Sequence, residues 1–163
     1  MSRAFAGIVA GAAAGAAGAT GLNIVSYAAT ALQGTSGESG PETTADALAD
    51  AAGTEVPGDA EAKKVRKTAI GNLAGIGVGV GLGAIAGLLR AYHVKIPKAL
   101  SPILMGASAM AISDGAMVKM GVTDPHTWDA KTVASDALPH LAYGLVQTAT
   151  LHRLLDPRTP LAG

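Results

Sequence analysis

Residues 69 to 92, AIGNLAGIGVGVGLGAIAGLLRAY, contain one charged side chain, that of Arg90. This run exceeds the roughly 20 apolar residues that a helix needs to cross a hydrocarbon core about 30 Å thick. Five glycines follow one another at strict four-residue spacing and share one helix face: Gly71, Gly75, Gly79, Gly83 and Gly87. In water each would cost about 0.8 to 1 kcal/mol relative to alanine, whereas in lipid small residues let helices approach closely. The pattern predicts a membrane-spanning helix with glycine-zipper packing.

Three further segments are predicted to be membrane-spanning helices. They cover residues 4–32, 98–120 and 132–155. The first carries no charge, which also fits a cleaved signal peptide, but the run is longer than the apolar region of such a peptide. The sequence therefore predicts an all-α fold: an integral membrane bundle of four transmembrane helices forming a single domain over residues 1–163.

The segment from 34 to 62 is strongly acidic and contains no Lys or Arg. Its Pro and Gly residues indicate an extramembrane loop. Within it, residues 43–52 have the pattern of a short amphipathic helix, for which Thr43 or Thr44 is the expected N-cap. A basic cluster follows at the expected membrane boundary: Lys63, Lys64, Arg66 and Lys67.

Composition excludes several classes of function. The chain has no cysteine, which rules out disulfides, thiolate metal sites, iron–sulfur clusters and thiol catalysis. Its formal net charge is zero, so no nucleic-acid partner is expected. No pattern matches a catalytic, cofactor or metal-binding motif. We therefore expect a protein without enzymatic activity, cofactor or metal.

The last predicted helix carries a polar stripe. Four side chains recur at spacings of four, three and four residues: Asp136, His140, Tyr143 and Gln147. Such groups should face the bundle interior, because unpaired polar groups facing lipid are costly. Pro139 lies within the stripe and removes a backbone N–H, which leaves the Ser135 carbonyl without its usual partner.

Other helices contribute polar residues at a similar predicted depth. Because consecutive helices alternate in direction, residues late in the first and third helices lie level with residues early in the second and fourth. The residues that meet this condition are Asn23, Tyr27, Asn72, Asp114, Asp136 and His140. They predict one polar pocket that opens toward the acidic loop. Three interpretations remain open: pairing that only fixes helix register, a proton, ion or small-ligand site, and groups that extend to the bilayer edge.

The glycine faces also allow two interpretations. Residues 69–92 and the series Gly7, Gly11 and Gly15 could pack against each other within one chain. Five glycines exceed what one short crossing needs, so part of the face could instead serve a homo-oligomer or a larger membrane complex.

Three stretches carry a resemblance: SDGAM (113–117), GVTDPHTW (121–128) and SDALPHLAYG (135–144). In these stretches the chain resembles small Gly/Ala-rich four-helix membrane proteins of high-GC actinobacteria, a group with no assigned activity. The resemblance implies a multi-pass protein of the bacterial plasma membrane and carries over no functional residue.

Two hypotheses follow. The first is an accessory or scaffold subunit of a membrane assembly, acting through the glycine face. The alternative is a small proton or ion channel or transporter that uses the Asp/His site. Lys and Arg are equally numerous on the two predicted sides of the membrane, so the positive-inside rule gives no orientation.

Overall fold

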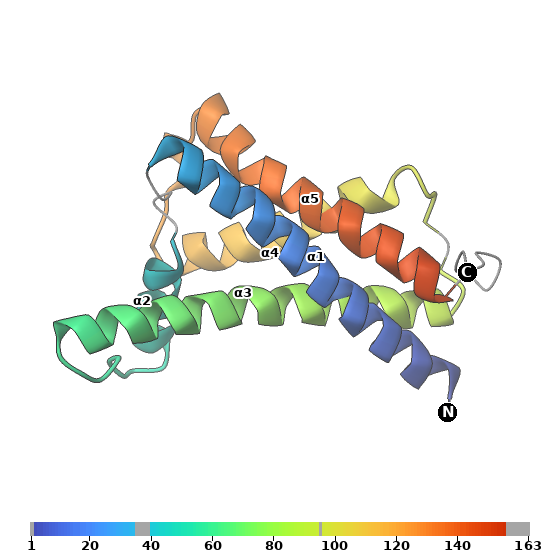
Figure 1. Ribbon diagram of the computed structural model, residues 1–163, viewed down its shortest axis with the longest axis horizontal. Helices are drawn as coiled ribbons and strands as arrows, with labels where there is room; N and C mark the ends of the chain where they lie inside the picture. The colour runs from blue at the N-terminus through green and yellow to red at the C-terminus, as the bar shows by residue number, and fades with distance from the viewer. Residues whose placement is uncertain (1, 35–39, 95, 156–163) are drawn as a thin grey trace.

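The computed structural model describes residues 2–34, 40–94 and 96–155, and all regular secondary structure in these residues is helical (Figure 1). The elements are α1 (Arg3–Gln33), α2 (Pro41–Ala51), α3 (Ala60–Ala91), α4 (Ser101–Lys119), η1 (Pro125–Thr127) and α5 (Ala130–Leu155). The predicted all-helical class is confirmed. Residues 35–39 of the predicted acidic loop lie outside the described residues.

Three of the described helices, α1, α3 and α4, are long and apolar enough to cross a membrane. Helix α5, predicted as a fourth crossing, is not among them. It is long enough, but its 26 residues include Lys131, Asp136 and Arg153 as well as two histidines. Charged side chains at the centre of a bilayer are costly, so a crossing by α5 would require other helices to cover its polar stripe.

Helices α1 and α3 run antiparallel in direct backbone contact. Gly7 lies against Gly87, Gly11 against Gly83, and Gly15 against Gly79. A Cβ added at Gly7 would lie 2.6 Å from the Gly87 carbonyl oxygen, closer than real Cβ atoms come to a neighbour. Only glycine permits such an approach along both helices.

The other long helices pack one beside the next. Helix α1 also packs against α5, and α5 packs against α4, whereas α3 touches α4 and α5 only slightly. Gly18 of α1 receives the ring of Tyr143 and the side chain of Gln147. Gly144 of α5 lies against the Pro102 carbonyl of α4, and Gly106 of α4 lies against the His140 carbonyl. Glycines thus allow close packing in three helix pairs: α1 with α3, α1 with α5, and α4 with α5.

The ends of the helices fall into two groups (Figure 1). The N-terminus, the connection between α3 and α4, and the end of α5 lie at one end of the bundle. Helix α2 and the end of α4 lie toward the other. The alternating helix directions assumed for the polar pocket therefore agree with the observed arrangement.

Helix α3 begins at Ala60 rather than at residue 69. Asp59 is its N-cap, and the Asp59 carboxylate accepts a hydrogen bond from the Ala62 amide at 2.9 Å. The basic cluster is therefore helical and extends the apolar helix by more than two turns. The apolar run predicted only the part of α3 from residue 69 onward and did not include the charged residues that precede it.

Helix α2 begins at Pro41 with Gly40 as N-cap, so the expectation of a cap at Thr43 or Thr44 is wrong. Proline is favoured at the first helical position because its missing N–H would have no intrahelical partner there. The backbone of Pro41 packs closely against Gly71 of α3. This contact holds the start of α2 against α3.

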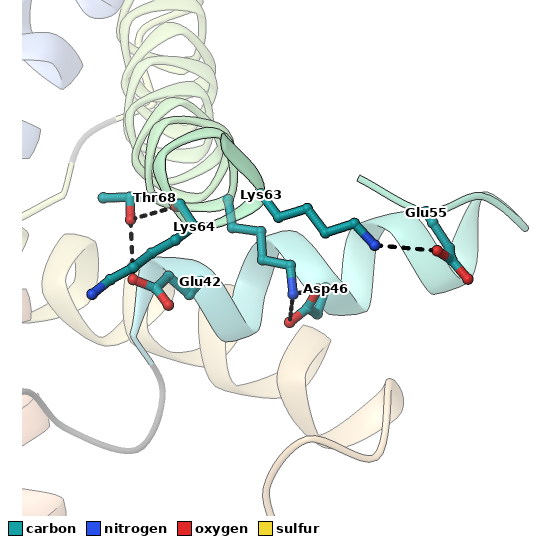
Figure 2. A network of polar contacts seen from close by, with 7 residues as sticks. Glu42, Asp46, Glu55, Lys63, Lys64 and Thr68 are labelled. Carbon is teal, nitrogen blue, oxygen red and sulfur yellow. Dashed lines mark hydrogen bonds and ion pairs between the residues drawn. The ribbon is translucent and has the colours of Figure 1, made fainter. Parts of the chain in front are cut away.

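Ion pairs join α3 to α2 and to the connection that follows α2 (Figure 2). Lys67 lies 2.6 Å from the Asp46 carboxylate, and Lys63 lies 3.5 Å from Glu55. The Thr68 hydroxyl donates to Glu42 at 3.2 Å. The Thr44 hydroxyl also approaches the Met117 sulfur of α4. The described part of the acidic segment therefore packs against the start of α3.

Candidate functional site

Asp136 and His140 lie one turn apart near the start of α5. His140 Nδ1 is 2.8 Å from the Asp136 backbone carbonyl and 3.4 Å from its carboxylate. Because a carbonyl oxygen can only accept, Nδ1 carries a hydrogen in this arrangement. Proline at position 139, inside the helix, leaves the local backbone without one donor. The backbone and side chain of Asp136 therefore orient the imidazole together.

Asp114 of α4 completes a three-residue group, which we call the Asp/His cluster: Asp114, Asp136 and His140. The Asp114 carboxyl is near enough to both other side chains to interact electrostatically with each. The His140 side chain is 11% exposed and that of Asp136 is 40% exposed. The cluster thus has a buried side formed by the imidazole and a more open side formed by the carboxyl groups.

Tyr143 and Gln147 continue the polar stripe toward the middle of the bundle. Tyr143 is 1% exposed, and its hydroxyl donates to the Gly79 carbonyl of α3 at 2.7 Å. Gln147 is fully buried, and its Oε1 accepts from the Thr148 hydroxyl at 3.2 Å. Its Nε2 has no hydrogen-bond partner among the described residues. A buried amide donor without an acceptor is costly, which makes this position unusual for a purely structural stripe.

Asn23 and Tyr27 of α1 belong to the polar pocket that the sequence predicts. Tyr27 is 56% exposed, and Asn23 is half-buried. Within the described part of the chain, no hydrogen bond joins either side chain to the Asp/His cluster. Their membership of the site stays a prediction.

The five-glycine face of α3 is divided among several neighbours. Gly79, Gly83 and Gly87 contact α1, and Gly71 contacts Pro41 of α2. Gly75 has open space where a side chain would lie, as do Gly77 and Gly81. The bare surface available to another molecule is therefore made mainly by glycines outside the strict four-residue series.

Sequence reasoning did not anticipate the polar contacts between α2 and α3. Acidic residues at 42 and 46 recur at helical spacing, as do the basic residues at 63 and 67. Complementary spacing of this kind is a signal that could have predicted two facing helices. Asn72, expected in the polar pocket, lines a separate hollow beside Lys64 and Thr68.

The Asp/His cluster has the chemistry of a proton-binding site. Two carboxyl groups and one imidazole can pass protons to one another or to a water molecule. The described residues contain no group of three or more His, Cys, Asp or Glu side chains placed to hold a metal ion. Comparison with protein families, curated proteins and solved structures finds no match to this chain.

Proposed function

We propose that this chain is a non-enzymatic, multi-pass protein of the bacterial plasma membrane that binds and passes protons through its Asp/His cluster. In this proposal α5 is the fourth membrane crossing, covered by α1 and α4. The observation that carries the proposal is the 3.4 Å approach of His140 to Asp136 within α5, with Asp114 of α4 near enough to interact electrostatically with both. Ionisable residues inside membrane segments commonly mark ion or proton pathways.

The stripe beyond the cluster supports the same proposal. Tyr143 and Gln147 extend it by two turns into the interior. The free Nε2 of Gln147 can donate to a water molecule or to a passing acceptor. A group of side chains that only fixed helix register would be expected to satisfy its own hydrogen bonds.

Flux measurements in liposomes test this proposal. Purified protein is reconstituted, and proton entry is followed with a trapped pH-sensitive dye while a potential is applied. We expect flux above that of empty liposomes, and we expect Asp136→Asn and His140→Ala to lose it. Asp50→Asn is the matched control, because Asp50 is an exposed carboxylate of α2 outside the cluster. Proton flux no greater than that of empty liposomes would reject the proposal.

A second function is supported by a different observation. Gly75, Gly77 and Gly81 leave part of the apolar α3 surface uncovered by the described residues. In lipid, glycine-rich surfaces favour close helix association. We propose as the alternative an accessory or scaffold subunit in which glycine-zipper packing joins α1 to α3 and the uncovered glycines meet a partner helix.

The alternative is tested by native-gel migration of gently solubilised protein. A larger species is expected for the unmodified chain and a monomer for Gly77→Leu. Gly79→Leu is less suitable, because Gly79 already contacts Ala19 and Tyr143 within the chain. This substitution would disturb the packing inside the monomer as well as the proposed contact with a partner helix. Migration as a monomer in every mild detergent would count against a scaffold role.

A further inference from the structure

A shallow hollow of about 420 Å³, open to its surroundings, lies on the surface of α3 where the helix passes from its basic start to its apolar run. Six residues line it: Glu61, Lys64, Val65, Thr68, Ala69 and Asn72. They recur at three- and four-residue spacing, so they form one stripe on the helix surface. The hollow is distinct from the Asp/His cluster and shares no residue with it.

Lys64 is the cation available to this hollow. Its three basic neighbours are already engaged: Lys63 with Glu55, Lys67 with Asp46, and Arg66 with the Pro57 carbonyl. Within the described ranges the Lys64 ammonium group has no such partner. Figure 2 shows the Lys63 and Lys64 side chains leaving α3 in opposite directions. Contacts with α2 and with the residues that follow it therefore engage Lys63, Arg66 and Lys67, and leave Lys64 on the other side of the helix.

The polar groups follow a definite order along the helix. Glu61 is outermost, Lys64 follows one turn later, and Asn72 lies deepest. Val65 and Ala69 supply apolar surface between them. The Thr68 hydroxyl is already engaged by Glu42 and by the Lys64 carbonyl. The order from water toward lipid is thus Glu61, which can accept from an ammonium group, then Lys64, which can donate to a phosphate, and then the Asn72 amide.

We propose that this hollow binds the headgroup of a phospholipid that carries a primary ammonium group and a phosphate, as phosphatidylethanolamine does. Glu61 accepts hydrogen bonds from the ammonium group, and Lys64 pairs with the phosphate. Asn72 donates from its amide to an ester carbonyl of the glycerol region, while the acyl chains follow the apolar surface of α3. This order of charges matches the order of groups in the lipid.

Two features favour a lipid over a soluble phosphate compound. The inner end of the hollow leads into residues 69–91, which belong to a helix apolar enough to cross a membrane. Asn72 is half-buried at that depth, and its amide has no hydrogen-bond partner in the part of the chain that the structure describes. A lipid ester group can satisfy such an amide where water is scarce.

Native mass spectrometry of the full chain in mild detergent tests the inference. The protein is titrated separately with the ethanolamine, glycerol and choline forms of a dioleoyl phospholipid. We expect preferential binding of the ethanolamine form, reduced about fivefold in Lys64→Gln. Asn72→Leu should reduce binding of all three lipids, and Glu61→Gln should abolish the preference for the ethanolamine form.

Lys63→Gln is the matched control, because it removes the same charge from the adjacent residue on the side that faces Glu55. Circular dichroism checks that each variant keeps its helices. The inference is overturned if Lys64→Gln binds the ethanolamine lipid as the unmodified chain does. Equal loss in Lys63→Gln and Lys64→Gln would also overturn it, since general charge attraction would then explain the binding. Inorganic phosphate that displaces the lipid would identify a soluble anion site instead.

Discussion

The hydroxyl of Tyr143 donates a 2.7 Å hydrogen bond to the backbone carbonyl of Gly79, linking α5 to α3 across 64 positions of sequence. These two helices otherwise touch only slightly. The tyrosine ring also packs against Gly18 of α1. The Tyr143 side chain of α5 therefore contacts both α1 and α3. The absence of a side chain at Gly18 and at Gly79 makes room for it.

Tyr143→Phe should therefore destabilise the bundle without changing its helical content. The variant loses one buried hydrogen bond and keeps the ring, which corresponds to about 1 kcal/mol. Unfolding in a detergent–denaturant titration, followed by circular dichroism, measures the change. Tyr27→Phe is the control, because Tyr27 is 56% exposed and should show no effect. Equal stability of both variants would show that the Tyr143–Gly79 hydrogen bond contributes nothing.

A packed glycine and an open glycine of α3 should respond differently to substitution by alanine. A Cβ at Gly83 would lie 2.6 Å from Gly15 Cα, so Gly83→Ala should separate α1 from α3 and cost about 1 to 3 kcal/mol. A Cβ at Gly77 would meet open space, so Gly77→Ala should stabilise the helix by about 0.5 to 1 kcal/mol. The same unfolding titration compares them. Similar losses from both substitutions would contradict the observed packing of α1 on α3.

The proposed four membrane crossings predict that the two ends of the chain are reached from the same side. The sequence has no cysteine, so single cysteines can be introduced as labels. Ser2→Cys and Leu154→Cys should react with an impermeant maleimide from one face of sealed vesicles, and Asp50→Cys from the other. Labelling of Ser2→Cys and Leu154→Cys from opposite faces would show that α5 does not complete a fourth crossing.

Acid should loosen the start of α5. The Thr132 amide donates to the Asp129 carboxylate at 2.7 Å, and this hydrogen bond lowers the pKa of Asp129 below its usual value. Because the folded chain has the lower pKa, the cap stabilises the helix above the unfolded pKa and is lost as pH falls through the folded pKa. Amide hydrogen exchange at Thr132, corrected for its intrinsic rate, should accelerate over that range. Asp129→Asn should remove the step, and an unchanged step in this variant would exclude Asp129 as its cause.

Much of the helical organisation could be predicted because its causes are local. Uncharged runs of sufficient length located α1 and the apolar part of α3, and four-residue spacing placed glycines on common faces. Local patterns also separated the acidic segment from the apolar helices. They did not predict the start of α3 at Ala60, because residues 60–68 are stabilised by the Asp59 cap and by contacts with α2.

The sequence by itself determined where the apolar helices lie and which residue types each helix face presents, since both depend on composition and on the helical period. Only the tertiary structure decided which faces meet. It directs Gly79 toward both Gly15 and Tyr143, brings Asp114 near the other two members of the Asp/His cluster, and leaves Tyr27 exposed. These outcomes depend on the crossing positions and rotations of whole helices, which arise from many contacts between residues far apart in the chain.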